Sequence, residues 1–309
     1  ATQKDPYLSF GGGGETHIRP TASEAFALAV SVKTGAYDAG KAGVSLPVAK
    51  EYALRLVRSL ARQHLANTPG GWGDQWQSAL WASSAGTAGW LLWDDLSPAD
   101  RESVRRMVER EANRFTAYNV PYYSTREGKI ISPGDTKAEE NAWNGRILQL
   151  ATAMMPQHPH RSVWQKKMIE LMLSAFSRPS DTTSTRQLHG RTLAEWLLGS
   201  NVGNDGSVVN HDRIHPDYFA TVTDNAHGAL LYALVGLPIP HAEFFNADTV
   251  YASLVNQPFA GKTIYRDGSA NIYYPAGTLW GGQRRMHFAL FDIQAQAFGF
   301  DKKASKTGA

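Results

Sequence analysis

Residues 201–218 hold the densest group of side chains that can move protons. Within this segment His211 and Tyr218 offer a base and an acid, and Arg213 and His215 lie between them. A neutral imidazole can accept a proton and a phenolic hydroxyl can donate one. The segment is rich in Asn, Asp and Gly, so we expect a loop, where functional groups often lie. A structural interpretation also fits, in which Asn-Asp-Gly forms a turn and His-Pro-Asp-Tyr begins a helix.

A second polar cluster spans residues 134–146. On a helix, Glu140 and Asn144 share one face, and Asn141 lies three residues before Asn144 on a similar side. Because Asn is a poor helix former, two of them beside Trp143 indicate amide groups used for recognition. A capped helix N-terminus explains the acidic residues of this cluster better than it explains the asparagines.

Tryptophan is unusually frequent, with nine in the chain and five of them between Trp72 and Trp93. Aromatic faces next to carboxylate and amide groups suit sugar rings, so we assign Trp72, Asp74 and Trp76 to substrate binding and most other indoles to the core. Arginines near the polar clusters suit an acidic substrate. The predicted substrate-binding residues are Trp72, Asp74, Trp76, Glu140, Trp143, Arg146, Arg213, His215 and Arg284.

The run Asp205-Gly-Ser-Val-Val-Asn-His211 resembles the Asp-Gly-Ser-x-x-x-His segment of hyaluronate and chondroitin lyases of the α/α-toroid type. In that family a Tyr follows the His and an Asn comes from an earlier Asn-x-Trp segment, which Tyr218 and Asn141-Ala-Trp143 match here. The resemblance implies that His211 is the base, Tyr218 the proton donor and Asn141 the partner of the substrate carboxylate, with Asn144 as a competitor for that last role. Heparinase II/III-like and alginate lyases use similar sets. Fewer residues separate His211 from Tyr218 than separate the corresponding His and Tyr of the family, and the chain has no large all-β C-terminal domain.

Lyase chemistry suits these residue types. The proton beside a uronate carboxylate is removed, and the glycosidic oxygen is then expelled. Amide or guanidinium groups stabilise the negative charge that develops on the carboxylate. No cofactor is needed. A metal site is disfavoured, because Pro216 disrupts the helical spacing of His211 and His215 and no His-Glu-x-x-His pattern occurs.

Two other functions remain open. A glycoside hydrolase needs a pair of carboxylates, which the chain offers among Asp74, Glu139, Glu140, Asp205 and Asp217. A non-catalytic carbohydrate-binding protein would use the Trp and Tyr side chains alone.

Composition excludes several classes of protein. Charged residues make up 19% and hydrophobic residues 42% of the 309 positions, which is typical of a globular chain. The absence of Cys excludes disulfides and thiolate metal sites. Basic residues form no long runs, which argues against nucleic acid as a partner. No apolar stretch is long enough to span a membrane.

We expect a monomer that acts on an acidic polysaccharide. We also expect it to be secreted or periplasmic, because the N-terminal Ala suits cleavage of a signal peptide.

Helical periodicity dominates the chain and predicts a mainly α fold, an α/α toroid with short β-hairpins in its loops. Capping signals place helix starts near Thr21, Pro47, Ser97 and Asp135. Further helices are expected around 76–92, 164–176, 190–199, 219–235, 241–255 and 283–298. Short strands are expected near Ile130, at 207–209 and at 263–274, the last turning at Asp267-Gly268. The expected organisation is an extended segment at 1–20, one toroid domain at 21–300 and a polar tail at 301–309.

Overall fold

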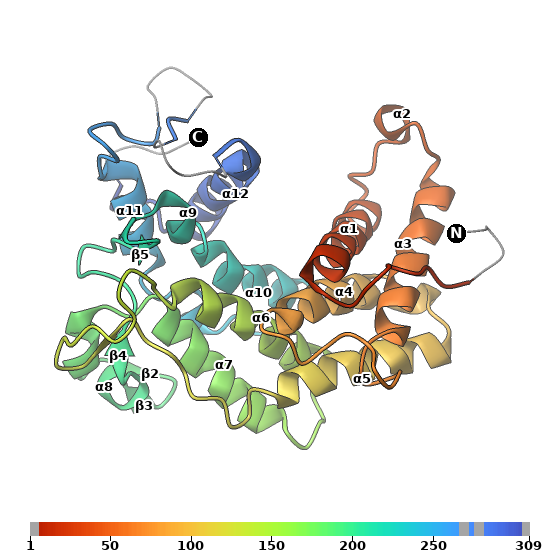
Figure 1. Ribbon diagram of the computed structural model, residues 1–309, viewed down its shortest axis with the longest axis horizontal. Helices are drawn as coiled ribbons and strands as arrows, with labels where there is room; N and C mark the ends of the chain where they lie inside the picture. The colour runs from red at the N-terminus through yellow and green to blue at the C-terminus, as the bar shows by residue number, and fades with distance from the viewer. Residues whose placement is uncertain (1–5, 266–271, 275–280, 305–309) are drawn as a thin grey trace. The chain divides into compact units, whose positions relative to one another are not determined.

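The structure, a computed structural model, describes residues 6–265, 272–274 and 281–304, and of residues 281–284 it describes the backbone only. It is mainly helical, with helices over 56% of the described residues and a few short strands, which confirms the mainly α fold class (Figure 1). The chain divides into two compact units. Unit 1 comprises Ala1–Tyr118 and Arg146–Gln165, and unit 2 comprises Asn119–Gly145 and Lys166–Ala309.

Unit 1 is built around four helices that pack on one another, α1, α3, α4 and α5. Its elements are α1 (Glu15–Lys33), α2 (Ala39–Ala42), α3 (Leu46–Arg62), α4 (Ser78–Leu91), η1 (Trp93–Asp95) and α5 (Pro98–Asn113). Helix α4 is made largely of small residues and is buried on nearly all sides. Gly86 has no space for a side chain, because an added Cβ would lie 2.6 Å from Val108 of α5. Small residues therefore let the neighbouring helices approach α4 closely.

Two helices contribute residues to both units, α6 (Ala138–Met154) and α7 (Arg161–Ala175). The remaining elements belong to unit 2: β1 (Ser124–Thr125), η2 (Pro179–Thr183), β2 (Gln187–Leu188), β3 (Arg191–Thr192), α8 (Leu193–Trp196), β4 (Gly199–Ser200), β5 (Val209–Asn210), β6 (Arg213–Ile214), α9 (Pro216–Phe219), α10 (Val222–Leu234), η3 (His241–Phe244), α11 (Ala247–Asn256) and α12 (Gly281–Phe298). The strands pair antiparallel as β1 with β4, β2 with β3 and β5 with β6. They hold loops in place and form no extended sheet.

Several sequence predictions need correction. Helix α1 begins at Glu15, ahead of the predicted start at Thr21, because the buried stripe of Ile18, Ala22, Ala25 and Ala29 begins before it. The predicted extended segment at 1–20 is correspondingly shorter. The helix expected at 190–199 is reduced to the four residues of α8.

Other predictions differ in detail or fall outside the described residues. The helix expected at 241–255 is split into η3 and α11, because Asn246 between them adopts a left-handed conformation with φ 57°. The hairpin expected at 263–274 is seen as a bridge between Tyr265 and Ile272, but its turn at Asp267-Gly268 lies outside the described residues. So does the tail at 305–309. No helix in the described part of the chain is long and apolar enough to cross a membrane.

Candidate active site

His211 lies at the tip of the β5–β6 hairpin, in a two-residue turn. Asn210 pairs with Arg213, and His211 and Asp212 between them have φ values of 51° and 58°. Such a turn favours Asn-Gly or similar pairs, because side chains other than Gly are strained at positive φ. The β2–β3 hairpin makes the same kind of turn with His189-Gly190, at φ 49° and 77°. The second residue of the turn is therefore Gly190 in the β2–β3 hairpin and Asp212 in the β5–β6 hairpin.

The hairpin is fastened to the segment that leads into α6. The amide of Thr136 donates to the carbonyl of Val209 at 2.9 Å, and the amide of Asp212 donates to the carbonyl of Gly134 at 3.1 Å. Gly134, at φ +67°, has no room for a side chain, because a Cβ there would lie 1.9 Å from Oδ1 of Asp212. The two polar clusters singled out in the sequence, 134–146 and 201–218, thus meet in unit 2.

Asn201 connects the segments around this hairpin through hydrogen bonds of its side-chain amide. It is 1% exposed. Its Oδ1 accepts hydrogen bonds from the amides of Tyr123 at 2.8 Å and Lys137 at 3.2 Å, and its Nδ2 donates to the carbonyl of Ser174 at 2.8 Å. One buried amide therefore connects the loop after residue 119, the start of α6 and the end of α7. Sequence reasoning missed this residue, and its place in an Asn-rich loop gave no signal of the role.

His211 and Tyr218 form a pair. Nε2 of His211 lies 2.9 Å from the phenolic oxygen of Tyr218, with ring centroids 5.7 Å apart. Tyr218 is on the short helix α9, which begins with Pro216 after an extended His215. The imidazole of His211 is exposed, whereas Tyr218 is 7% exposed and packs in the apolar core of unit 2. The site therefore combines a surface imidazole with an anchored phenol.

Two predicted substrate-binding residues lie next to this pair. Arg213 is exposed, and its Nε donates to the backbone carbonyl of His211 at 3.3 Å. The ring of His215 lies 5.6 Å from that of His211 and 5.1 Å from that of Tyr218, measured between centroids. His215 is only 2% exposed. Arg213 can therefore reach a bound ligand, while His215 supports the pair from the interior.

The two candidate asparagines are both buried, contrary to the expectation of amides that face a substrate. Asn141 is 0% exposed, and its Nδ2 donates to the carbonyl of Pro121 at 3.0 Å and to Oγ of Ser174 at 3.1 Å. Asn144 is 2% exposed, and its Oδ1 has no hydrogen-bond partner among the described residues. The cause is that all residues from 141 to 145 are buried, so this turn of α6 has no solvent face. The amide nitrogen of Asn141 connects α6 to its surroundings, and its Oδ1, like that of Asn144, has no hydrogen-bond partner among the described residues.

The other residues of the first cluster are buried or half-buried. Trp143 is 6% exposed, and Glu140 is half-buried on α6. Arg146 is also half-buried, and it belongs to unit 1, whereas Glu140 and Trp143 belong to unit 2. The side chain of Arg284 lies outside the described residues.

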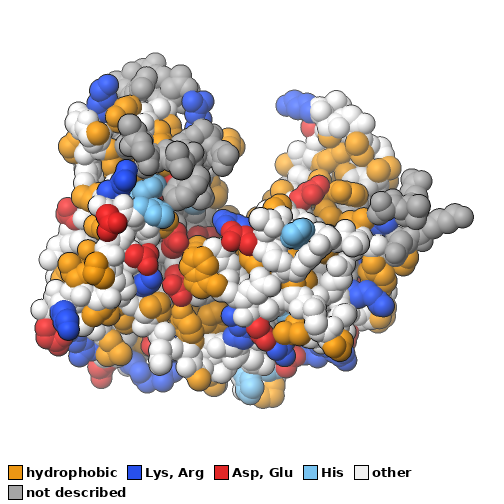
Figure 2. Space-filling model, viewed as in Figure 1, with side chains coloured by type: hydrophobic (Ala, Val, Ile, Leu, Met, Phe, Trp, Pro, Cys, Tyr) orange, Lys and Arg blue, Asp and Glu red, His pale blue; other side chains and the backbone are white. Residues whose placement is uncertain are grey.

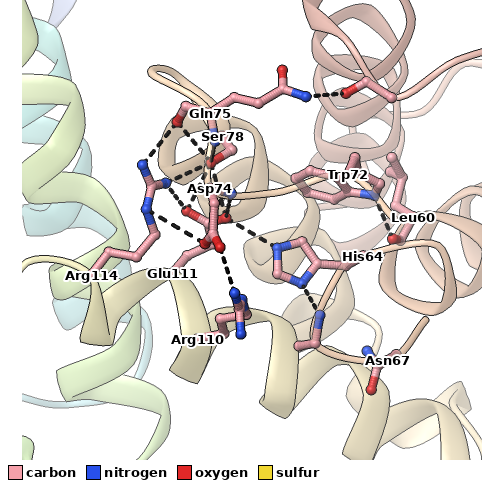
Figure 3. A network of polar contacts seen from close by, with 12 residues as sticks. Leu60, His64, Asn67, Trp72, Asp74, Gln75, Ser78, Arg110, Glu111 and Arg114 are labelled. Atoms are coloured by element: carbon pink, nitrogen blue, oxygen red, sulfur yellow. Dashed lines mark hydrogen bonds and ion pairs between the residues drawn. The ribbon is translucent and has the colours of Figure 1, made fainter. Parts of the chain in front are cut away.

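The predicted binding residues near Trp72 lie in unit 1, and the structure gives them different roles. Trp72 is 3% exposed, donates from Nε1 to the carbonyl of Leu60 at 2.9 Å, and packs edge-on against His64 with centroids 4.6 Å apart (Figure 3). This corrects the prediction, because a satisfied and buried indole is part of the core. Asp74 and Trp76 are exposed, the latter at 59%.

A buried charged network in unit 1 was also missed. His64, just after the end of α3, is 0% exposed, and its Nε2 lies 3.1 Å from Glu111, which is itself 0% exposed (Figure 3). Burial alone would raise the pKa of Glu111, but the hydrogen bond from His64 and the charge of Arg114 outweigh burial and lower the pKa. The available signal was a carboxylate on the apolar face of α5, among Val104, Met107 and Val108.

No protein-family model, curated protein or solved structure matches the chain. The site must therefore be judged on its own chemistry. No group of three His, Cys, Asp or Glu side chains that could hold a metal ion occurs within the described ranges. On the face drawn in Figure 2, basic and acidic side chains are interspersed. What the geometry offers is one shared proton between His211 and Tyr218, with a guanidinium beside them.

Proposed function

We propose that the chain is a polysaccharide lyase that cleaves a uronic-acid-containing glycan by β-elimination. The observation that carries this proposal is the 2.9 Å contact between Nε2 of His211 and the hydroxyl of Tyr218. The β5–β6 turn, with His211 at φ 51°, holds the imidazole at the exposed hairpin tip, where a substrate can reach it.

The pair can complete a reaction cycle without a cofactor. His211 accepts the proton beside the uronate carboxylate and becomes an imidazolium. Tyr218 donates its phenolic proton to the glycosidic oxygen as the carbon–oxygen bond breaks, which leaves a double bond in the sugar. The imidazolium then returns its proton to the phenolate, so the pair regains its starting state. General acid–base assistance of this kind contributes about 10²–10⁴-fold to the rate.

Neutralisation of the substrate carboxylate is assigned to Arg213 or Asn144. Arg213 is exposed and bonded to the backbone of His211, so it is placed beside the reacting groups. On Asn144 the group that can pair with a carboxylate is the amide nitrogen, because the side-chain oxygen, which has no partner within the described residues, can only accept hydrogen bonds. Asn141, the residue that the family resemblance favours, has its amide nitrogen committed to Pro121 and Ser174.

The scaffold that we propose is an incomplete α/α toroid, which the mainly helical fold supports at the level of fold class. A polysaccharide substrate also favours a location outside the cytoplasm, so a secreted or periplasmic protein remains part of the proposal.

The experiment is incubation with a panel of acidic polysaccharides while the absorbance of unsaturated uronates is followed. The proposal expects absorbance to rise with at least one polymer and to stay flat with His211→Ala. Reducing ends that form without this absorbance would replace the lyase with a hydrolase. Retention on a glycan resin without any product would instead identify a binding protein.

A further inference from the structure

Unit 1 has a groove of about 570 Å³ along α5 that the proposed reaction does not use. Three arginines line it, Arg106, Arg110 and Arg114, each four residues from the next. That spacing puts them on one face of the helix, about 6 Å apart along its axis. The same groove is lined by Asp74, Glu109 and Asn113. Its walls thus present a row of cations with hydrogen-bond acceptors between them.

Buried groups fix one end of the row. Arg114 donates to Oγ of Ser78 at 2.6 Å and to the carbonyl of Gln75 at 3.0 Å, and it contacts the carboxylate of Glu111 (Figure 3). Glu111 is fully buried and is also held by His64. A guanidinium held by a buried carboxylate is already in place before a ligand arrives, which reduces the entropy lost on binding.

The other two arginines keep donors available. Each guanidinium has five N–H groups. Arg106 uses Nε for Glu102, at 2.8 Å, and Arg110 uses one terminal nitrogen for Asp74. Their side chains are 55% and 43% exposed, and neither makes another hydrogen bond within the described residues. Two exposed guanidinium groups therefore have unused donors beside the groove.

Asp74 occupies the position where an acidic ligand would bind. Its carboxylate contacts Arg110 and lies 3.7 Å from Nε of Arg114, and its side chain is 41% exposed. An ion pair this exposed is weak and is screened by salt, so another carboxylate can displace it. Asp74 lines the groove and has a left-handed backbone, with φ 56°. The ion pair between Asp74 and Arg110 thus occupies the contacts that the carboxylate of a ligand would make.

We propose that this groove binds an acidic oligosaccharide, whose carboxylates pair with Arg106 and Arg110 and displace Asp74. The carboxylate of Glu109, which contacts Arg105 and His158, lies on the wall and disfavours the closely spaced phosphates of a nucleic acid. Oδ1 of Asn113 is used by Trp164 and His160, which leaves the amide nitrogen of Asn113 for a sugar hydroxyl. None of the described lining residues is aromatic, so bases would find no stacking surface. The choice of a uronate ligand rests on the proposed function, while the site rests on the groove alone.

The test is affinity electrophoresis of the whole chain in gels that contain polygalacturonate, alginate or hyaluronan. Methyl-esterified polygalacturonate serves as the uncharged comparison, and a single-stranded DNA oligonucleotide is tested by mobility shift. We expect at least one acidic polymer to bind, and the double variant R106Q/R110Q to bind about tenfold more weakly. Arg58→Gln removes one such charge from an ion pair on α3 whose residues do not line the groove, and it should bind as wild type.

A second variant keeps the test decisive if the double variant does not fold. Asp74→Asn removes the competing carboxylate but tolerates the left-handed conformation, so it should bind the acidic polymer several-fold more tightly. The proposal is overturned if no acidic polymer binds, if binding is indifferent to both variants, or if only DNA binds. Binding without unsaturated product would contradict the lyase and leave the groove intact. Unsaturated product together with unchanged binding in the variants would support the lyase and contradict the groove as a binding site.

Discussion

His211 and Tyr218 contact each other at 2.9 Å from opposite environments, an exposed hairpin tip and an apolar core. The hydroxyl of Tyr218 is anchored by a ring that packs inside unit 2, so its position is fixed. The imidazole of His211 is fixed instead by a strained turn and by backbone hydrogen bonds to the segment before α6. The two side chains are thereby positioned by separate parts of unit 2.

The first prediction concerns the two members of the pair. His211→Ala and Tyr218→Phe should each lower turnover by about 10²–10⁴-fold, because each removes one partner of the proton transfer. Tyr218→Phe keeps the ring in the core, so it should lose no more than about 1.5 kcal/mol of stability, the value of one hydrogen bond. Steady-state rates and urea unfolding measure the two effects.

His189→Ala is the matched control, since His189 has the same place in the β2–β3 turn that His211 has in the β5–β6 turn. It should retain full turnover. The double variant of His211 and Tyr218 should be no slower than the slower single variant, because the two act as a unit. Wild-type rates in both single variants would remove the pair from the mechanism.

The second prediction tests the strain at His211. His211→Gly and His211→Ala lose the same imidazole, but only glycine is relaxed at φ 51°. The glycine variant should therefore be the more stable of the two by about 1 kcal/mol. Urea denaturation of both variants gives the difference, and equal stabilities would mean that the turn is not left-handed at this residue.

The third prediction concerns the contact that fastens the hairpin. Gly134→Ala should reduce activity and lower stability by more than about 1 kcal/mol, because the new Cβ would overlap Asp212 as well as strain the backbone. Gly128→Ala is the control, since Gly128 has φ +80° but open space around it. Addition of Asp212→Gly should restore part of the activity of Gly134→Ala. If Gly134→Ala behaves like Gly128→Ala, the hairpin is not held at this point.

The fourth prediction concerns acid stability in unit 1. In the folded chain His64 and Arg114 hold the pKa of Glu111 below its ordinary value of 4.5 despite burial. The ionised carboxylate therefore stabilises the fold fully above that value, and the contribution is lost as the pH falls through the lowered pKa. Glu111→Gln should cost about 3 kcal/mol at neutral pH and flatten the acid limb of the curve of melting temperature against pH. An unchanged acid limb would show that Glu111 carries no such contribution.

Local signals predicted those helices whose ends are marked by the residues themselves. Ser97 before Pro98 caps α5 by accepting a hydrogen bond from the amide of Asp100, as the sequence predicted. The capping signal at Thr21 failed, since the apolar stripe that α1 buries begins at Ile18 and extends the helix past it. Periodicity of buried residues therefore outweighed a short capping motif.

The sequence pointed to residues that come into contact, but it did not predict which of the candidate residues are buried. Their residue types in one polar loop and the family resemblance singled out His211 and Tyr218, and the hairpin and the short helix α9 bring them into contact. The burial of Asn141 and Trp72 was not predictable, because it depends on which elements pack around them. Polar residues beside aromatic ones look alike in a sequence whether they line a cleft or satisfy each other inside a core.

The most direct test of the β-elimination claim is mass spectrometry of the products formed in water labelled with heavy oxygen. A lyase breaks the bond without adding water, so we expect products that carry a double bond and no label. Incorporation of the heavy oxygen at the new chain end, with no double bond, would contradict it and identify hydrolysis.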